Sequence, residues 1–279
     1  MRALRILALA AIAIGSALAA SAPAVPAAAP LDLWPGLADT LFPNRTMAQD
    51  GMIIKLGTPL SAEDAALVPI TLHMESAKKA SPADDAQRIT KVTLVIDNNP
   101  APVAAVIEFG PKAGVTTFET RVRVNQNTKI HAVAETADGK LYVSESYVAA
   151  AGGCSAPSAT NLDPNDPEIG TIKVRQLAPQ YVSDNPQRKE AVVMIKHPNN
   201  SGMQLDQTTH LYIPARYVDS LKVTQGDDLL FALTGGISIS EDPNFRFDYL
   251  SNGANVMRVD ASDTTGKKFS KDWPLNPAI

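Results

Sequence analysis

Short runs rich in β-branched residues, separated by turn residues, constrain the fold of this chain more than any other feature. Clusters of Asn, Asp, Gly and Pro separate these runs, and the pair Asp138-Gly139 is a strong β-hairpin signal. Strands at this spacing predict an antiparallel β-sandwich. In the first half of the chain the expected strands are Val68 to Met74, Ile89 to Ile96, Val103 to Phe109, Thr116 to Val124, Lys129 to Thr136 and Leu141 to Val148.

A second series of such runs occupies the last third of the sequence. Its expected strands are Ile172 to Leu177, Ala191 to His197, His210 to Ile213, Ser220 to Thr224, Asp228 to Thr234, Phe245 to Leu250, Asn255 to Ala261 and Lys267 to Lys271. Between the two series, Gly152 to Gly170 is rich in Pro, Asn and Asp and has no apolar run, which predicts a linker. The sequence therefore predicts an all-β chain of two β-sandwich domains joined by a linker.

The N-terminal residues have the pattern of a secretory signal. A short basic flank precedes an unbroken run of apolar and small residues from Ile6 to Ala20. We expect residues 1–20 to be a signal peptide and residues 21–50 to be a leader with a short helix near Leu33 to Leu41. Because an adjacent pair of arginines is lacking, export to the periplasm by the Sec route is favoured. A retained membrane anchor is the alternative.

The composition argues against several classes of function. A formal net charge of -4 leaves no basic surface for nucleic acid, and 5% aromatic residues disfavour base stacking. We expect no metal and no cofactor, because the four histidines lack zinc-site spacing and are more typical of polar positions on strands or loops. No nucleophile elbow, phosphate loop or dinucleotide fingerprint occurs, so an enzyme is the least favoured class. The histidines are His73, His131, His197 and His210.

Cys154 is the single cysteine of the chain, so it has no intramolecular disulfide partner. It follows Gly152-Gly153, and no β-branched or large apolar residue lies between Ala149 and Ala159. A thiol on a glycine stalk in an exported chain predicts an exposed sulfur that other proteins can reach. The alternatives are a buried small residue, a loop cysteine without a role, and a disulfide-linked homodimer through Cys154.

Motifs in both halves resemble one known family. In the first half they are Asn98-Asn99-Pro100-Ala101-Pro102, Phe109-Gly110-Pro111-Lys112-Ala113-Gly114, Thr120-Arg121-Val122-Arg123, Asp138-Gly139-Lys140 and Gly152-Gly153-Cys154. In the second half they are Lys173-Val174-Arg175, Ile195-Lys196-His197-Pro198, Ile213-Pro214-Ala215-Arg216-Tyr217 and Gly236-Ile237-Ser238-Ile239-Ser240. On these motifs residues 51–156 resemble SoxY and residues 169–274 resemble SoxZ, the two subunits of the SoxYZ sulfur carrier of periplasmic thiosulfate oxidation.

The resemblance implies a covalent carrier without a catalytic constellation of its own. It implies that Cys154 is the attachment site for sulfur or a related thiol-bound intermediate, and that Gly152 and Gly153 form a swinging arm. It also implies two immunoglobulin-like sandwiches, at residues 51–150 and 169–279, that pair with each other across a linker at 151–168. The implied partners are periplasmic Sox-type enzymes or c-type cytochromes, or a quinoprotein dehydrogenase system, because fused chains of this type resemble carriers associated with such dehydrogenases.

Two departures from the family pattern affect these expectations. SoxY ends in Gly-Gly-Cys-Gly-Gly, whereas here Ser155-Ala156-Pro157 and a second domain follow the cysteine. A segment tethered at both ends enters an active site only as a doubled strand, and its reach from Ala149 to Cys154 is at most about 18 Å. The nearest linker charges, Asp163, Asp166 and Glu168, predict a slightly raised thiol pKa, so activation would come from the partner.

The residues also leave open a different class of function. The chain could be a non-covalent accessory or assembly module for a periplasmic quinoprotein dehydrogenase system, in which Cys154 is dispensable.

Overall fold

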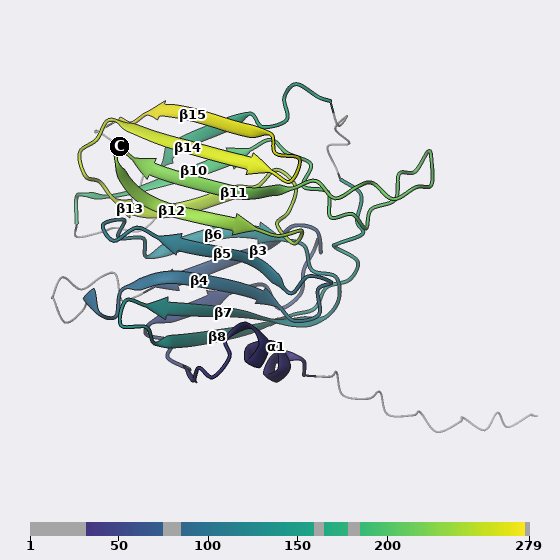
Figure 1. The fold of residues 1–279 in the computed structure, drawn as a ribbon, viewed down its shortest axis with the longest axis horizontal. Helices are drawn as coiled ribbons and strands as arrows, with labels where there is room; N and C mark the ends of the chain where they lie inside the picture. The colour runs from purple at the N-terminus through teal and green to yellow at the C-terminus, as the bar shows by residue number, and fades with distance from the viewer. Residues whose placement is uncertain (1–31, 75–84, 159–164, 178–184, 277–279) are drawn as a thin grey trace, which may run out of the picture. The chain divides into compact units, whose positions relative to one another are not determined.

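The computed structural model describes residues 32–74, 85–158, 165–177 and 185–276. Across these residues the chain is built from β-strands, with one α-helix, α1 (Trp34–Leu41), near the N-terminus (Figure 1). The helix confirms the short helix expected in the leader. The signal peptide predicted for residues 1–20 lies outside the described residues. Among the described residues, we find no helical segment that meets the length and hydrophobicity needed for a membrane span.

The strands follow the two predicted series closely. The first half supplies β1 (Met47–Ala48), β2 (Ile54–Gly57), β3 (Val68–Met74), β4 (Ile89–Ile96), β5 (Val103–Phe109), β6 (Thr117–Val122), β7 (Thr128–Thr136) and β8 (Leu141–Val148). The second half supplies β9 (Ile172–Leu177), β10 (Arg188–Ile195), β11 (Val218–Gln225), β12 (Asp228–Gly235), β13 (Asn244–Leu250), β14 (Val256–Asp263) and β15 (Lys268–Pro274). The predicted hairpin at Asp138-Gly139 joins β7 to β8, with Gly139 at φ +78°.

One predicted strand is wrong. His210 to Ile213 lies in an irregular hairpin, residues 200–216, which is held by isolated bridges between Asn200 and Arg216 and between Leu205 and Tyr212. The segment is apolar, but no sheet edge covers it. This hairpin projects beyond the strands that flank it, β10 and β11 (Figure 1).

Two sheets make up the fold, and both run through the two halves of the chain. The nine-stranded sheet has the order β1-β8-β7-β4-β5-β12-β11-β14-β15, and the six-stranded sheet has the order β2-β3-β6-β13-β10-β9. The halves meet where β5 pairs antiparallel with β12 and β6 pairs antiparallel with β13. The predicted all-β sandwich fold is confirmed, and the two sandwiches are joined edge to edge in both sheets.

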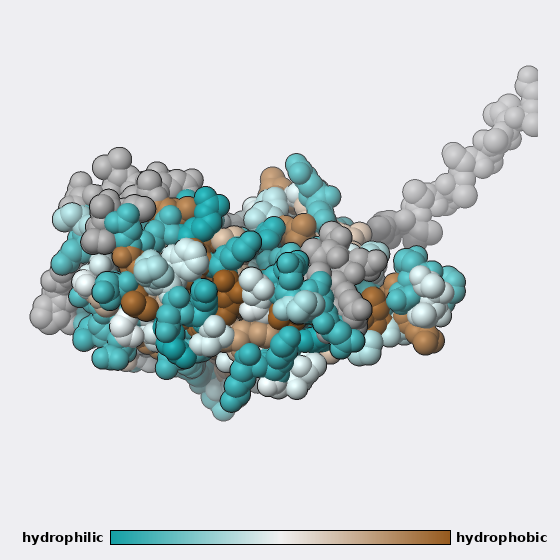
Figure 2. Space-filling model, turned by 90° about the horizontal axis from the view of Figure 1, so that it is seen from above, coloured by the Kyte–Doolittle hydropathy of each residue, from teal (hydrophilic) through white to brown (hydrophobic). Residues whose placement is uncertain are grey.

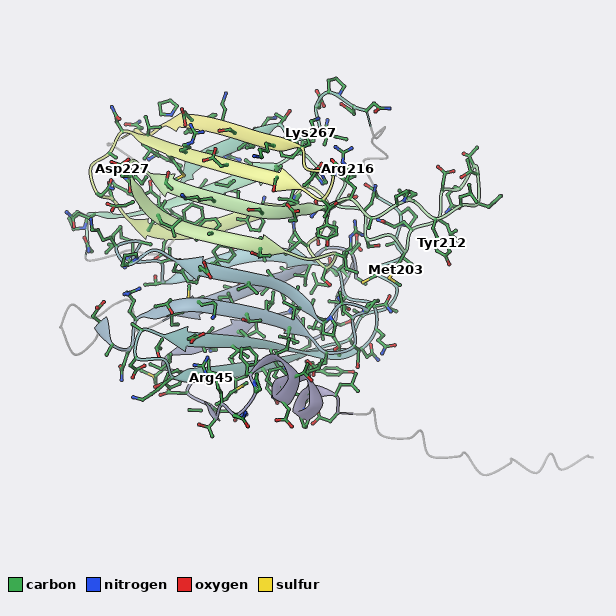
Figure 3. The ribbon with its side chains drawn as sticks, in the orientation of Figure 1. Arg45, Met203, Tyr212, Arg216, Asp227 and Lys267 are labelled. Atoms are coloured by element: carbon green, nitrogen blue, oxygen red, sulfur yellow. The ribbon has the colours of Figure 1, made fainter. Side chains whose placement is uncertain are left out.

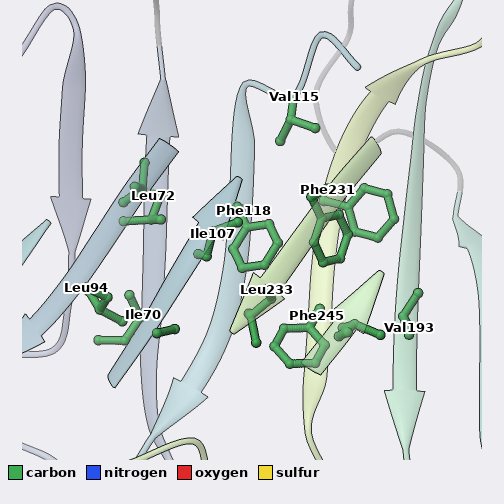
Figure 4. Packing of buried hydrophobic residues seen from close by; sticks show 14 of the residues in the cluster. Ile70, Leu72, Leu94, Ile107, Val115, Phe118, Val193, Phe231, Leu233 and Phe245 are labelled. Atoms are coloured by element: carbon green, nitrogen blue, oxygen red, sulfur yellow. The ribbon is translucent and has the colours of Figure 1, made fainter. Parts of the chain in front are cut away.

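The hydrophobic core continues across this seam. Phe118 on β6 is fully buried, and its ring centroid lies 5.1 Å from that of Phe231 on β12 and 6.1 Å from that of Phe245 on β13 (Figure 4). Edge-to-face and tilted contacts of this kind stabilise aromatic clusters beyond the area they bury. Each half therefore supplies part of a shared core.

Two glycines of the sequence motifs lie at the seam, where backbone must approach backbone. A Cβ on Gly110 would lie 1.8 Å from the carbonyl oxygen of Leu229, and a Cβ on Gly236 would lie 2.8 Å from that of Val103. The Gly110 N–H donates to the Leu230 oxygen at 3.1 Å. These motifs therefore serve the contact between the halves.

Candidate functional site

The Cys154 turn, residues 151–156, follows β8 and packs against the end of β6. The Gly152 N–H donates to the carbonyl oxygen of Asn125 at 2.7 Å, and the Gly153 N–H donates to that of Val124 at 3.0 Å. Within the turn, the Ala156 N–H donates to the Gly152 oxygen at 2.9 Å. The segment is thus folded onto the strand end.

The Cys154 side chain is fully buried, with an exposed fraction of 0%. The expectation of an exposed sulfur on a bendable stalk is therefore wrong for this conformation. The reason lies in Gly153, where a Cβ would be 2.0 Å from the Ala65 oxygen and 2.6 Å from the Val124 oxygen. The missing side chain lets the turn pack closely, whereas the sequence had suggested that glycine serves mobility.

Arg123, just beyond the end of β6, lies beneath the turn and is also fully buried. Its Nη1 donates to the Gly153 carbonyl oxygen at 3.2 Å. Its Nη2 lies 4.0 Å from the Glu241 Oε2, which is too long for a hydrogen bond, and among the residues that the structure describes neither Nε nor Nη2 has a hydrogen-bond partner. Burial lowers the pKa of Arg123, while the charges of Glu241 and Cys154 oppose that shift.

The thiol is held in its protonated form. Burial raises the pKa of Cys154 to about 11, and the Arg123 charge only partly opposes this. Since the thiolate is the reactive form, the buried thiol is a poor nucleophile near neutral pH. The predicted direction of the shift is confirmed, but its cause is burial and not the acidic linker. Asp163 lies outside the described residues.

Polar groups of the second half complete the site. The Ser201 Oγ, at the base of hairpin 200–216, donates to the Cys154 carbonyl oxygen at 2.5 Å. The backbone N–H of Arg123 donates to the Ser238 carbonyl oxygen at 2.7 Å, and the Ser240 Oγ donates to the Ala66 carbonyl oxygen at 2.6 Å. Both halves of the chain therefore hold the cysteine in place.

A buried cluster supports the base of the hairpin. His197 Nδ1 accepts the Asn199 N–H at 3.0 Å, so its Nε2 carries the proton that faces the Asp263 Oδ2 at 3.3 Å. The Arg216 Nε donates to the same carboxylate oxygen at 2.9 Å. Burial alone would raise the pKa of Asp263, but hydrogen bonds from Thr265, Arg216 and His197 lower it to about 2. The two second-half motifs around His197 and Arg216 thus meet at one structural cluster.

Sequence reasoning identified Cys154, Gly152 and Gly153 but missed the residues around them. Asn99 donates from Nδ2 to the Arg123 oxygen at 2.7 Å and to the Ser238 Oγ at 2.9 Å, and so links the two halves beneath the turn. Asn99 and Arg123 both stand in motifs that carried the family resemblance, which was the available signal. Nothing in the spacing of Ser201 indicated its contact with Cys154.

His131, on β7, takes part in a different set of contacts. His131 is buried between Asp97, at 2.9 Å from Nδ1, and Glu145, at 3.2 Å from Nε2, and Trp34 of α1 stacks on its ring at 3.7 Å. Among the residues that the structure describes, no group of three or more His, Cys, Asp or Glu side chains could hold a metal ion.

In comparisons with known protein families, both halves of the chain match families of sulfur oxidation proteins. The family model "Sulfur oxidation protein SoxY" matches residues 38–154, and the model "Sulphur oxidation protein SoxZ" matches residues 180–274. Together they cover most of the chain, and the SoxY match ends at Cys154. The chain is therefore of the sulfur-carrier class. It belongs to the SoxYZ family as a fused chain, with a SoxY domain followed by a SoxZ domain.

Solved structures give a weaker likeness. The sulfur carrier protein SoxY from Chlorobium limicola f thiosulfatophilum is 19% identical, with a TM-score of 0.33, and the match covers 42% of this chain and 91% of that one. A tetra-tandem repeat from the extending region of a large adhesion protein is 11% identical, with a TM-score of 0.26, and covers 81% and 49%. Among curated protein sequences, none matches this chain.

Proposed function

We propose that this chain is a periplasmic sulfur carrier in which Cys154 holds the covalent intermediate, stored in a closed position between visits to partner enzymes. The observation that carries the proposal is the position of the single cysteine: it ends the SoxY match and sits on a turn held by both domains. The family supports the carrier function itself. The attachment role of Cys154 and the swinging movement of Gly152 and Gly153 are our proposal.

The closed position requires that the turn open before the sulfur can react. Opening breaks the hydrogen bonds of Gly152 and Gly153 to the β6 end, and those of Arg123 and Ser201 to the turn carbonyls. At about 0.5–1.5 kcal/mol net for each bond, the open form is a few per cent of the population or less. A partner that binds only the open form would draw the arm out.

Anchors on both sides limit how far the open arm extends. The Ala149 N–H donates to the Leu60 oxygen at 2.9 Å, and the Ala149 oxygen accepts the Ala62 N–H at 2.9 Å. Beyond the cysteine, Ser158 donates to Glu241. The moving segment is therefore short, and a partner enzyme needs a cleft wide enough for two strands.

Hairpin 200–216 is the surface that such a partner would meet beside the turn. Leu211 and Tyr212 are 69% and 68% exposed, and Tyr212 and Met203 lie on the projecting hairpin while Arg216 lies at its base (Figure 3). On the face shown in Figure 2, by contrast, hydrophobic residues are interspersed among hydrophilic ones. Contact with this hairpin would act on Ser201, which holds the turn closed. We propose Sox-type enzymes, c-type cytochromes or a quinoprotein dehydrogenase system as the partners.

A second function is favoured by one specific observation, the burial of the thiol. If the turn never opens, the chain would serve as a non-covalent assembly module of a periplasmic dehydrogenase system, and Cys154 would be a packing residue. A Cys154–Cys154 disulfide between two copies would also require the turn to open, because the sulfur is closed to solvent here.

A Cys154→Ser variant distinguishes the two functions. The variant is expressed in the native host in place of the wild-type chain, and growth and oxygen uptake are measured with thiosulfate and with an alcohol as the electron donor. The carrier function predicts loss of one of these activities, while a control on an exposed position of β11, Ser220→Ala, keeps it. Full activity of the Cys154→Ser variant on both donors would contradict the carrier function and favour the assembly function.

A further inference from the structure

The base of hairpin 200–216 depends on a buried histidine that accepts a backbone hydrogen bond. His197 follows β10, and its side chain is fully buried. Its Nδ1 accepts the Asn199 N–H at 3.0 Å, and its Nε2 faces the Asp263 Oδ2 at 3.3 Å. Because a ring nitrogen accepts a hydrogen bond only when it carries no proton, this arrangement fixes His197 as the neutral Nε2–H tautomer.

This hydrogen bond and two others hold Asn199 in an uncommon backbone conformation. Its φ is +41°, in the left-handed region that few non-glycine residues adopt, although Asn adopts it more readily than most. Its Oδ1 accepts the Val218 N–H at 3.1 Å, and its Nδ2 donates to the Ile239 oxygen at 3.3 Å. Asn199 thus ties the chain just before the hairpin to the first residue of β11, which follows it.

The charges around the imidazole leave it one carboxylate partner. Among the described residues, the charged ones around His197 are Asp263 at the end of β14, Arg216 at the hairpin base, Asp242 before β13, Lys267 before β15 and Lys196 beside it in the chain. Asp242 accepts the backbone N–H of His197 at 3.0 Å, and Lys196 pairs with Glu168. Lys267 lies over the ring of Phe269, which meets His197 edge-on. Asp263, the partner of the imidazole, is already neutralised by Arg216, whose Nε donates to it at 2.9 Å.

We propose that His197 is an acid-sensitive latch for hairpin 200–216. A proton taken from solvent onto Nδ1 removes the acceptor of the Asn199 N–H, so two N–H donors then face each other and the hairpin base loosens. Ser201 leaves the same base to hold the Cys154 carbonyl, and a looser base weakens that hold. The latch itself does not depend on the proposed carrier function, whereas its use in releasing the Cys154 turn does.

The direction of the pH effect follows from the two states of the base. In the closed base, burial lowers the pKa of His197, although the Asp263 carboxylate opposes that shift. In the open base the imidazole is hydrated, with an ordinary pKa of about 6.5. The open base therefore binds a proton more tightly, and the latch is fully effective above pH 6.5 and weakens as the pH falls below it. Asp263 stays ionised throughout this range, because its pKa is about 2.

The test is hydrogen exchange of the purified full chain at pH 7.5 and pH 5.0, expressed as protection factors so that the intrinsic pH dependence of exchange cancels. The amides that report on the latch are Asn199, Asn200, Arg216 and Val218. We expect their protection to fall roughly five- to thirtyfold at pH 5.0, the upper limit for uptake of one proton. The amides of β5 and β12, strands without a histidine, should keep theirs.

Two substitutions separate His197 from other titrating groups. In His197→Asn, the carboxamide oxygen takes the place of Nδ1 as the acceptor and does not titrate, so protection at the hairpin base should be the same at both pH values. His210→Gln is the matched control, because His210 is an exposed histidine of the same hairpin. This variant should keep the wild-type response.

A measurement on the wild type alone applies even if His197→Asn does not fold. In ¹⁵N-labelled chain, the Asn199 amide proton should move upfield between pH 7.5 and 5.0, together with titration of the His197 ring nitrogens. Protection at the hairpin base that is independent of pH in the wild type, or a full response in folded His197→Asn, would overturn the latch. Either result leaves the carrier function standing, since that function fails separately, if Cys154→Ser is fully active in the host.

Discussion

At the scale of single residues, the site depends on one cysteine, one glycine and one arginine. Gly153 lets the turn come so close to β6 that Cys154 is closed to solvent. Arg123 holds the Gly153 carbonyl and is itself left partly unsatisfied. The burial that protects the sulfur also raises the pKa of the Cys154 thiol to about 11. The thiol is therefore unreactive while the turn is closed.

The pH dependence of thiol reactivity follows from that raised pKa. The alkylation rate of a free cysteine levels off once the pH exceeds its pKa, which is about 8.5. In the native chain the neutral closed thiol competes with the reactive open thiolate, so the iodoacetamide rate should rise roughly tenfold per pH unit through pH 9 and continue toward pH 10–11. In urea-unfolded chain the rate should level off near pH 9. A plateau at or below pH 8.5 in the native chain would show that the thiol is already open.

Substitution of Gly153 tests whether close packing keeps the turn shut. A Gly153→Ala side chain would collide with the backbone oxygens of Ala65 and Val124, which cannot move aside cheaply. We expect alkylation of Cys154 at pH 7.5 to speed up at least about tenfold. Gly152→Ala is the matched control: its Cβ would meet only the Ser155 Oγ, at 3.9 Å, so its cost is limited to the strain of φ +76°, about 1–2 kcal/mol. Equal rates in the two variants would contradict the packing account.

At the scale of elements, hairpin 200–216 connects the exposed surface to the Cys154 turn. Ser201 at its base holds the Cys154 carbonyl, and the His197–Asp263–Arg216 cluster fixes the strands from which the hairpin leaves. The element thus has a hydrogen-bonded base, a polar turn at residues 207–209 and exposed apolar side chains, Leu211 and Tyr212, just after that turn.

Loss of the Ser201 contact should open the turn without unfolding the chain. Ser201→Ala removes one hydrogen bond, worth about 0.5–1.5 kcal/mol. Cys154 alkylation under native conditions should therefore rise roughly 2- to 10-fold. Ser220→Ala, on an exposed position of β11, should leave the rate unchanged. An unchanged rate in Ser201→Ala would mean that the hairpin does not control access to the sulfur.

The cluster under the hairpin predicts a loss of stability in acid. The pKa of Asp263 is about 2 in the folded chain and about 3.9 when unfolded, so its ionised form stabilises the fold fully above pH 4. That contribution, roughly 2 kcal/mol, is lost as the pH falls from 4 to 2. Urea unfolding should show the stability gap between wild type and Asp263→Asn shrinking over this range. A gap that stays constant would contradict the assigned pKa.

At the scale of the whole molecule, the two halves share both sheets and one core. Phe118 of the first half packs on Phe231 and Phe245 of the second, and close contacts at Gly110 and Gly236 align the edges. A core of this kind predicts that the halves unfold as one cooperative unit.

The two tryptophans of the chain allow a direct check of that cooperativity. Trp34 lies in α1 and Trp273 in β15, so Trp273→Phe reports on the first half and Trp34→Phe on the second. Both fluorescence transitions in urea should share one midpoint. Phe118→Ala should shift both together, at a cost of about 3–5 kcal/mol. Midpoints that separate would show two independent domains.

Most of the fold could be predicted from the sequence, because strand periodicity and turn residues are local signals. The hairpin at Asp138-Gly139 and the strand series are examples. The irregular hairpin around His210 could not be predicted, because whether an apolar run finds a sheet edge depends on the tertiary fold. The burial of Cys154 was missed for a related reason: Gly152-Gly153 permits both a free arm and close packing, and only the position of Ala65, Val124 and Ser201 decides between them.

The most direct test of the central claim is the intact mass of the chain isolated from its native host during growth on a reduced sulfur compound, under non-reducing conditions and with free thiols blocked. The account predicts that part of the population carries an added sulfur-containing mass, which maps to Cys154 by peptide analysis and disappears on reduction. A population whose Cys154 is entirely an unmodified thiol, in cells that are oxidising sulfur, would contradict it.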